Sequence, residues 1–251
     1  MALTGTVVMG PSNSVCGADP QPGSRLQAAY SLAMTAHESQ PGAHAATSIG
    51  HLSRQLADTT RQLYDLGWMR GTSGNVSVRA SVDPTRLIVS ASGFTKHRAG
   101  VEHAVVTDDR GVALSDQEFL PSAEAQVHAA IIAETGAGAV VHVHAISSVL
   151  AASRWPGGVV LRDVEQLKGL GRSAEGEDVR IPVVENSQDM HALSESIRGS
   201  LEPLTPLILV AGHGMYVWGT DLEDAANRTE SADWLLQLAL MNPILGSGAR
   251  T

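Results

Sequence analysis

Hydrophobic residues follow helical and strand-like spacings along most of the chain after about residue 48. The stretch from Leu52 to Leu66 carries leucines on one helical face, and Gly67 suits the left-handed position just beyond a helix end. Runs of β-branched residues separated by turn residues then predict short strands. These strands are Asn75–Arg79, Arg86–Ser90, His103–Thr107 and a shorter one at Gly111–Leu114.

The second half of the chain alternates predicted helices with predicted strands. Pro121 is predicted to open a helix that runs to Glu134, because proline is tolerated at the first helical position. The capping-box spacing of Thr220 and Glu223 predicts a long last helix over Asp221–Met241. Between these helices the pattern predicts a strand at residues 139–144, a helix over Ala145–Ser153, a strand over Val159–Leu161, a helical stretch over Glu165–Leu170, a strand over Ile181–Val184, a helix over Met190–Ile197, a central strand over Leu207–Ala211 and a strand paired with it over Met215–Trp218.

This order of elements predicts an α/β fold, in which one domain has three α/β/α layers and a mixed, largely antiparallel central sheet. The domain is expected to span residues 49–245. Residues 1–48 are rich in Gly, Ala, Ser and Pro, which predicts a disordered extension in which only Arg25–His37 has helical spacing.

Composition and charge exclude several classes of protein. The chain has 251 residues, of which 43% are hydrophobic, enough for the core of one domain. A net charge of −9 and the lack of a basic stripe argue against nucleic-acid binding. No apolar run reaches the roughly 18 residues of a membrane helix, and no basic signal region precedes Arg25. The single cysteine, Cys16, forms no internal disulfide, so the predicted location is the reducing cytoplasm, without a membrane partner.

Three histidines follow apolar runs and are candidate metal ligands. Alternate residues of a strand share a face, so His142 and His144 point together while Val141 and Val143 point the other way. His213 follows a second apolar run and lies between two glycines. Three imidazoles at strand ends leave a coordination position open, which is typical of a catalytic metal site. Histidines that simply pack at strand ends fit the same spacing equally well.

Other segments contain groups that bind anions or move protons. The glycine-rich loops Gly71–Ser77 and Ser90–Arg98 can hold an anion, and Ser122 would add a hydroxyl at a helix start. Glu124 and Glu165 are candidate acid/base carboxylates. Each feature also has an ordinary interpretation, as a turn, a solvated loop or an acid in the first turn of a helix.

Taken in order, these motifs resemble the class II aldolase/adducin family from about Leu52 to Leu240. The matching segments are GWMRGTSGNVSVR, SASGFTK, PSAEAQVH, AVVHVHA, EQLKGL, IPVVENSQD and GHGMYVWG. The HVH and GHG pair is typical of the whole family, whereas EQLKGL, IPVVEN and VWG indicate its dehydratase branch. The resemblance implies a class II aldolase-like catalytic domain that removes water from a small phosphorylated ketose.

The resemblance also implies roles for individual residues. It implies zinc, or another divalent metal, on His142, His144 and His213. The acid/base glutamate of the dehydratases falls on Glu165, whereas that of the related aldolases falls on Glu124. Active sites between the subunits of a homotetramer are implied as well. The expected phosphate-binding residues are Ser73, Gly74, Asn75, Ser92, Gly93, Lys96 and Ser122.

Other activities on the same scaffold remain alternatives. A sugar-phosphate aldolase or epimerase is the main one, but the aldolases use a tyrosine in the C-terminal segment, and here the last tyrosine is Tyr216. A decarboxylase is a further alternative. An adducin-like interaction module would lack the metal histidines, and the three histidines present here argue against it.

Overall fold

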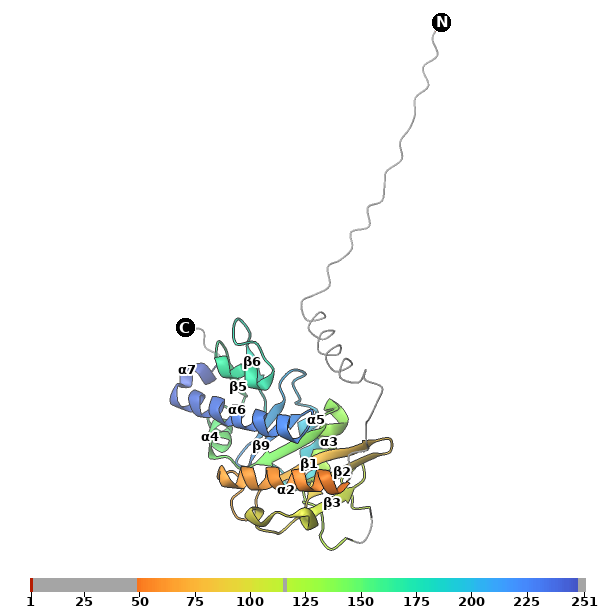
Figure 1. Cartoon of the computed structure of the whole chain (residues 1–251). Coiled ribbons are helices and arrows are strands. Elements are labelled where there is room, and N and C mark those ends of the chain that lie inside the picture. The colour runs from red at the N-terminus through yellow and green to blue at the C-terminus, as the bar shows by residue number, and fades with distance from the viewer. Residues whose placement is uncertain (2–48, 115–116, 248–251) are drawn as a thin grey trace. The chain divides into compact units, whose positions relative to one another are not determined.

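The computed structural model describes residue 1, residues 49–114 and residues 117–247 (Figure 1). The predictions for residues 2–48, a disordered extension with helical spacing over Arg25–His37, lie outside the described residues. The described residues from 49 onward belong to one compact unit.

A seven-stranded sheet with the order β3-β2-β1-β4-β9-β8-β7 forms the middle of this unit. All neighbouring strands are antiparallel except β7 and β8, which are parallel. The predicted mixed, largely antiparallel sheet is therefore confirmed. The strands are β1 Asn75–Val82, β2 Thr85–Ser90, β3 Ala104–Thr107, β4 Ala139–Val143, β7 Val183–Val184, β8 Leu207–Val210 and β9 Gly214–Gly219.

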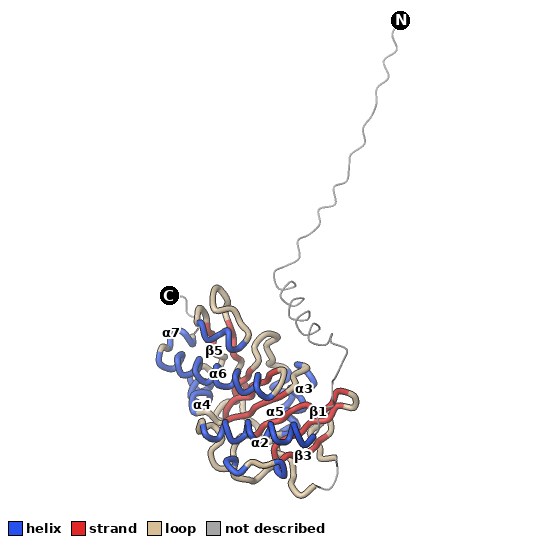
Figure 2. Tube along the Cα trace, viewed as in Figure 1, coloured by secondary structure: helices blue, strands red, loops and turns tan. Residues whose placement is uncertain are grey.

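Helices cover both faces of the sheet, which confirms the three-layer α/β/α fold (Figure 2). On one face, α2 Ile49–Asp65, α4 Ile146–Arg154 and α6 Leu222–Met241 share a core cluster with Val141 and Val143 of β4. On the other face, α3 Ala125–Thr135 and α5 Met190–Arg198 pack on Val140 and Ile208. The remaining elements are the 3-10 helices η1 Lys96–Arg98, η2 Val101–His103 and η3 Glu165–Leu170, the strands β5 Val159–Leu161 and β6 Val179–Ile181 of a small second sheet, and α7 Pro243–Gly246.

One predicted helix start and one predicted helix cap are wrong. Helix α3 begins at Ala125 rather than at Pro121, because Pro121 forms an isolated β-bridge with Ala91, the residue directly after β2. Helix α6 is not capped by Thr220. Instead, the carboxylate of Asp221 accepts a hydrogen bond from Asp224 N, and aspartate is a better N-cap than threonine.

Two predicted strands also differ from the structure. Gly111–Leu114 forms only an isolated bridge, between Ala113 and Thr107. The predicted strand Ile181–Val184 divides at Pro182, which has no N–H to donate, so β6 and β7 join different sheets. Strand β8 lies one position from the sheet edge, and β4 occupies the predicted central place.

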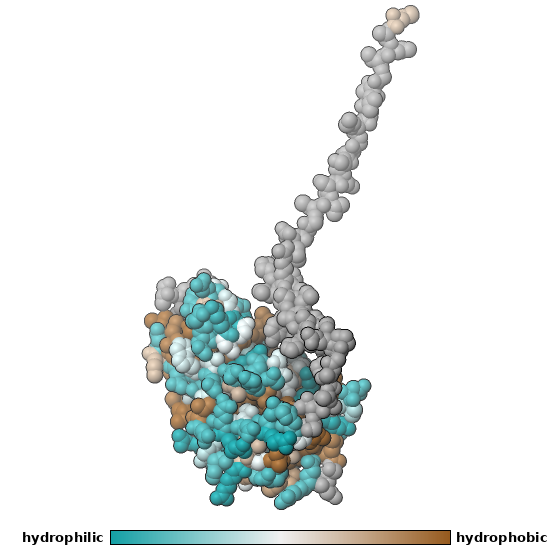
Figure 3. Space-filling model, in the orientation of Figure 1, coloured by the Kyte–Doolittle hydropathy of each residue, from teal (hydrophilic) through white to brown (hydrophobic). Residues whose placement is uncertain are grey.

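The surface is mixed in character. The face shown in Figure 3 is mainly hydrophilic, with hydrophobic patches between the polar residues. Several large apolar side chains are exposed, including Ile146 and Leu150 of α4 and Trp234 of α6. Within the described residues, no helix is both long and apolar enough to cross a membrane.

Candidate metal centre

One lateral row of the sheet brings polar side chains together beside the central strand β4. The register pairs His142 of β4 with Asn75 of β1 on one side and with Tyr216 of β9 on the other. Directly opposed residues of antiparallel strands project from the same face, here the face covered by α3. All three side chains are buried. The Tyr216 ring stacks on the His142 ring, with the centroids 4.1 Å apart.

Two glycines place His213 in the turn between β8 and β9. Gly212 has φ +64°, a left-handed conformation that glycine adopts without steric cost. A β-carbon on Gly214 would lie 2.2 Å from the carbonyl oxygen of Val143, so only glycine allows this close approach. The turn therefore packs against the end of β4, where His144 follows the strand.

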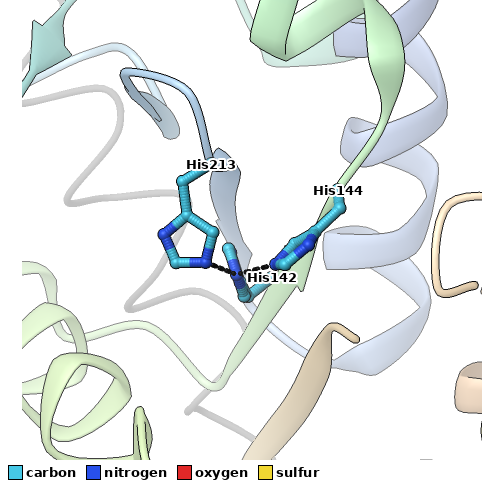
Figure 4. A group of neighbouring side chains, drawn as sticks. All are labelled: His142, His144 and His213. Carbon is cyan, nitrogen blue, oxygen red and sulfur yellow. Dashed lines mark hydrogen bonds between the residues drawn. The ribbon is translucent and has the colours of Figure 1, made fainter. Parts of the chain in front are cut away.

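The three histidine side chains converge on one point (Figure 4). The Nε2 atom of His142 lies 3.0 Å from that of His144 and 3.3 Å from that of His213. Tetrahedral zinc with bonds of about 2.0–2.1 Å would place two nitrogen ligands roughly 3.3–3.4 Å apart. The triad can therefore hold a divalent metal ion with little rearrangement.

The hydrogen bonds of His142 leave its Nε2 lone pair free. Its Nδ1 atom lies 3.0 Å from the carbonyl oxygen of Met215, which can only accept, so Nδ1 carries the proton. Burial lowers the pKa of His142 to about 3, although the charge of Glu124 acts in the opposite direction. Burial also lowers the pKa of His144. Neutral imidazoles with a fixed tautomer are the form that binds metals.

A carboxylate faces the same point. The Oε2 atom of Glu124 lies 3.3 Å from His142 Nε2, and its Oε1 atom lies 3.1 Å from His213 Nε2. Asn75 Nδ2 donates to Glu124 Oε2 at 2.6 Å. Burial acts to raise the pKa of Glu124, but the hydrogen bonds from His213 and Asn75 act against it, and this pKa lies well below its usual range.

Several electron-pair donors therefore meet with few protons between them. The His142 Nε2 atom is unprotonated, and the ionised Glu124 offers only acceptor atoms. The Nδ1 atom of His213 is buried without a hydrogen-bond partner among the described residues. Such convergence is unfavourable unless a cation lies among the donors, so the donor set fits a metal ion.

Glu165 lies elsewhere within the single chain. It is the first residue of η3, its side chain is 79% exposed, and its carboxylate accepts a hydrogen bond from Lys168 Nζ at 2.6 Å. No hydrogen bond or ion pair found among residues 49–114 and 117–247 joins Glu165 to the histidine triad. Of the two candidate acid/base residues, only Glu124 borders the triad of its own chain.

The predicted phosphate-binding segments lie together near the triad. Gly74 has φ +75°, and a β-carbon there would lie 3.0 Å from the carbonyl oxygen of His142. Gly93 also has φ +75°, and Ser73 and Ser92 lie in these two turns. The loops are joined by backbone hydrogen bonds from Lys96 N to Gly71 O, from Ser92 N to Leu120 O and from Ser122 N to Ser90 O.

Some predicted ligands are engaged within the protein. Both ends of the Asn75 amide bind protein groups, Glu124 at Nδ2 and His128 at Oδ1. Lys96 is buried, with Nζ 3.3 Å from the carbonyl oxygen of Ala91 and 4.0 Å from the ring centroid of Phe94. Burial lowers the pKa of Lys96 to about 8. Ser122 accepts a hydrogen bond from Glu124 N at 3.3 Å, just before the start of α3 proper.

Sequence reasoning gave no role at the site to Tyr216, which stacks on His142, or to Ser77, whose side chain contacts His128. The usable signals were spacings, because Asn75 and Ser77 share a strand face and Glu124 and His128 share a helix face. The stacking of Tyr216 on His142 depends on strand register, which no local motif shows.

The fold and the histidine triad together define a known class of protein. Residues 54–240 match the model of the Class II Aldolase and Adducin N-terminal domain family, and the chain belongs to this family. The predicted family is thereby confirmed. The chain is 31% identical to the methylthioribulose-1-phosphate dehydratase of Bacillus mycoides (strain KBAB4) and 32% identical to that of Bacillus thuringiensis subsp. konkukian (strain 97-27). Each match covers 72% of this chain and 86% of the relative.

Solved structures share the fold at lower identity. YgbL from Klebsiella pneumoniae, a putative aldolase/epimerase/decarboxylase, matches with a TM-score of 0.66 and 21% identity over 80% of this chain and 93% of its own. The L-fuculose-1-phosphate aldolase of Thermus thermophilus matches with a TM-score of 0.61 and 22% identity over 81% of this chain and 100% of its own. These similarities establish the class II aldolase fold alone.

Proposed function

We propose that this protein is a zinc-dependent lyase that removes water from 5-methylthioribulose 1-phosphate to give 2,3-diketo-5-methylthiopentyl 1-phosphate, a step of methionine salvage. The observation that carries the proposal is the convergence of the three histidines. The Nε2 atoms of His144 and His213 lie 3.0 Å and 3.3 Å from that of His142. The dehydratases that are 31–32% identical to this chain, with 86% of their length covered, support the choice of substrate.

The three histidines would hold the metal through their Nε2 atoms. When bound, a divalent ion supplies Lewis-acid chemistry that polarises the substrate carbonyl at C2. The protein must then transfer two protons. A base removes the proton from C3, and an acid protonates the hydroxyl that leaves C4 as water. One carboxyl group can do both in turn, and such a group typically contributes about 10²–10⁴-fold.

Glu165 is the proposed acid/base residue. Glu124 is the second candidate, and its position beside the triad of its own chain supports it. Glu124 lies 3.1–3.3 Å from two of the histidine Nε2 atoms. Glu165 is exposed in the single chain, so its role requires an active site that is completed between subunits. A role for Glu165 thus requires an active site between subunits, whereas Glu124 borders the triad within one chain.

A homotetramer with active sites between subunits is part of the proposal. Ile146, Leu150 and Trp234 are 72%, 52% and 50% exposed. The three residues belong to α4 and α6, two helices that are joined by the hydrogen bond between Ser147 and Asp233. Large apolar side chains exposed on neighbouring helices support an interface on this surface.

We propose that the substrate phosphate binds where the loops around Ser73, Ser92 and Ser122 meet. The backbone hydrogen bonds among these loops support a shared anion site. Gly74 and Gly93 would allow close approach of the backbone to the phosphate. Lys96 would contribute positive charge to this site. The side-chain amide of Asn75 is already engaged by Glu124 and His128.

A direct dehydration assay tests the reaction. Zinc-loaded protein and 5-methylthioribulose 1-phosphate should give an uncleaved diketone phosphate, detected by mass spectrometry as the loss of one water. Release of an aldehyde fragment would instead support an aldolase. An unchanged mass with inverted stereochemistry would support an epimerase, and release of carbon dioxide from a carboxylated sugar would support a decarboxylase.

Three glutamine variants test the role of each carboxylate. We expect Glu165→Gln to lower kcat by about 10²–10⁴-fold without loss of bound metal. Glu195→Gln is the matched control, because Glu195 is also an exposed glutamate in an i, i+3 ion pair, with Arg198. If Glu124→Gln abolishes turnover while Glu165→Gln does not, the acid/base role belongs to Glu124.

A further inference from the structure

Four buried or nearly buried side chains form a continuous polar bridge between β1 and α3. We use this name for Ser77, His128, Asn75 and Glu124. The Ser77 Oγ atom lies 2.8 Å from His128 Nδ1, His128 Nε2 contacts Asn75 Oδ1, and Asn75 Nδ2 donates to Glu124 Oε2 at 2.6 Å. Ser77 and His128 are fully buried, and Asn75 is 4% exposed. The bridge thus connects the interior of the domain to the histidine triad.

The spacing of the two elements explains why the bridge can form. Asn75 and Ser77 are two residues apart on one strand face, which separates them by about 6.6–6.8 Å. Glu124 is the N-cap of α3 and His128 lies four residues further on, a rise of about 6 Å on the same helix face. The strand pair and the helix pair therefore match in length, and the side chains interlock.

The charge of Glu124 determines where the protons of the bridge lie. A carboxylate only accepts hydrogen bonds, so the amide of Asn75 must turn its Nδ2 donor toward Glu124. Its Oδ1 atom then faces His128 Nε2, which must donate. The Nδ1 atom of His128 consequently accepts from the hydroxyl of Ser77. His128 is thus a neutral ring held in the Nε2–H tautomer.

We infer that His128 is a positioning residue, which fixes the Asn75 amide so that this amide holds the Glu124 carboxylate toward His142 and His213. The inference rests on the proposed function insofar as the histidine triad is the active site. Glu124 makes no side-chain cap bond to α3, and Asn75 donates the hydrogen bond that orients its carboxylate from β1. Packing alone does not call for a histidine here, because an apolar side chain of similar volume would avoid burying polar atoms.

Nitrogen-15 NMR of histidine-labelled protein tests the tautomer without any substrate. The His128 ring is identified by the signals that disappear in His128→Gln. We expect a protonated Nε2 and an unprotonated Nδ1 at neutral pH. A protonated Nδ1 overturns the inference, because Nε2 could then no longer donate to Asn75.

Kinetics of paired variants separate positioning from packing. His128→Leu keeps the approximate volume and removes both ring nitrogens, whereas His128→Gln keeps an N–H donor that can reach Asn75 Oδ1. We expect His128→Leu to lower kcat by about 10–100-fold with little change in KM, and His128→Gln to recover most of this loss. Thr229→Val on α6 is the control, since it removes a buried hydroxyl from the opposite face of the sheet.

Equal kcat values for His128→Leu and His128→Gln would overturn the inference, because a packing role does not distinguish them. If His128→Leu does not fold, the wild-type tautomer and the kcat of His128→Gln still decide the question. An inactive wild-type protein with the expected tautomer would sink the proposed function and not the polar bridge. An active protein with the wrong tautomer would sink only the inference about His128.

Discussion

The two faces of the central sheet are made by the same strands but serve different purposes. In β4, Val141 and Val143 pack into hydrocarbon beneath α2, α4 and α6. On the other face, His142 lies in a row with Asn75 and Tyr216, and α3 covers them. The comparison teaches that the two-residue period of a strand lets one short segment contribute only packing on one side and both packing and chemistry on the other.

The helices on these two faces show the same division. Both α6 and α3 have an acidic residue at the N-cap. Asp221 uses its carboxylate to accept from a backbone N–H of α6, which stabilises the helix. Glu124 makes no such bond, and its carboxylate faces two histidines instead. We call the face covered by α3 the chemical face, and the face covered by α2, α4 and α6 the apolar face. On the chemical face, the acidic group at the helix start faces the histidines instead of capping the helix.

The largest expected effect comes from removing a group on the chemical face. His142→Ala should reduce bound divalent metal from about one ion per chain to near none. It should lower kcat/KM by about a thousandfold or more, because Lewis-acid stabilisation is worth several kcal/mol. Metal analysis and the dehydration assay measure both. The control is His191→Ala, an exposed histidine on α5. Full metal content in His142→Ala would contradict the assignment of the metal to the histidine triad on this face.

Removing a group on the apolar face should have the opposite profile. Leu209 of β8 is fully buried beneath the α2, α4 and α6 layer. Leu209→Ala should lower the free energy of unfolding by about 2–5 kcal/mol, measured by urea denaturation. Bound metal and turnover per folded molecule should stay unchanged. A specific loss of metal binding would show that the faces are coupled.

Much of the triad could be predicted from local pattern. Strand alternation alone places His142 and His144 on one face, and the glycines around His213 mark a tight turn that fits against a neighbouring strand. The roles of Tyr216 and Asn75 could not be predicted in this way, because both depend on which strands pair with β4 and in what register. Register is set by contacts between distant segments.

Sequence reasoning also failed where two local conformations are equally acceptable and only the tertiary surroundings decide between them. Thr220 and Asp221 are both acceptable N-caps, and only the backbone around Asp221 decides between them. Lys96 has the same loop setting as an exposed cation, yet its stem and ammonium are buried beside Phe94. Burial of such a residue is a tertiary property, so the sequence around it carries little signal.

A smaller effect should appear in the pH dependence of stability on the chemical face. Burial lowers the pKa of His128 from 6.5 to about 4, against the charge of Glu124. Between these pH values the unfolded chain binds a proton that the native protein does not. Stability present above pH 6.5 is therefore lost as the pH falls toward 4, by roughly 3 kcal/mol. Urea denaturation of metal-free protein at neutral and acidic pH should show a smaller loss in His128→Gln, and equal losses would contradict the assignment.

The smallest expected effect concerns the helix end on the apolar face. Asp221→Ala removes the acceptor for Asp224 N and should lower the free energy of unfolding by about 1 kcal/mol, as measured by urea denaturation. Asp221→Asn should retain nearly all of this stability, because asparagine caps helices as well as aspartate. Neither change should alter turnover per folded molecule, since Asp221 lies at the N-terminus of α6, whose core contacts are on the apolar face. A loss of turnover in Asp221→Ala without loss of structure would mean that a carboxylate on the apolar side also serves the histidine triad, and the division between the two faces would fail.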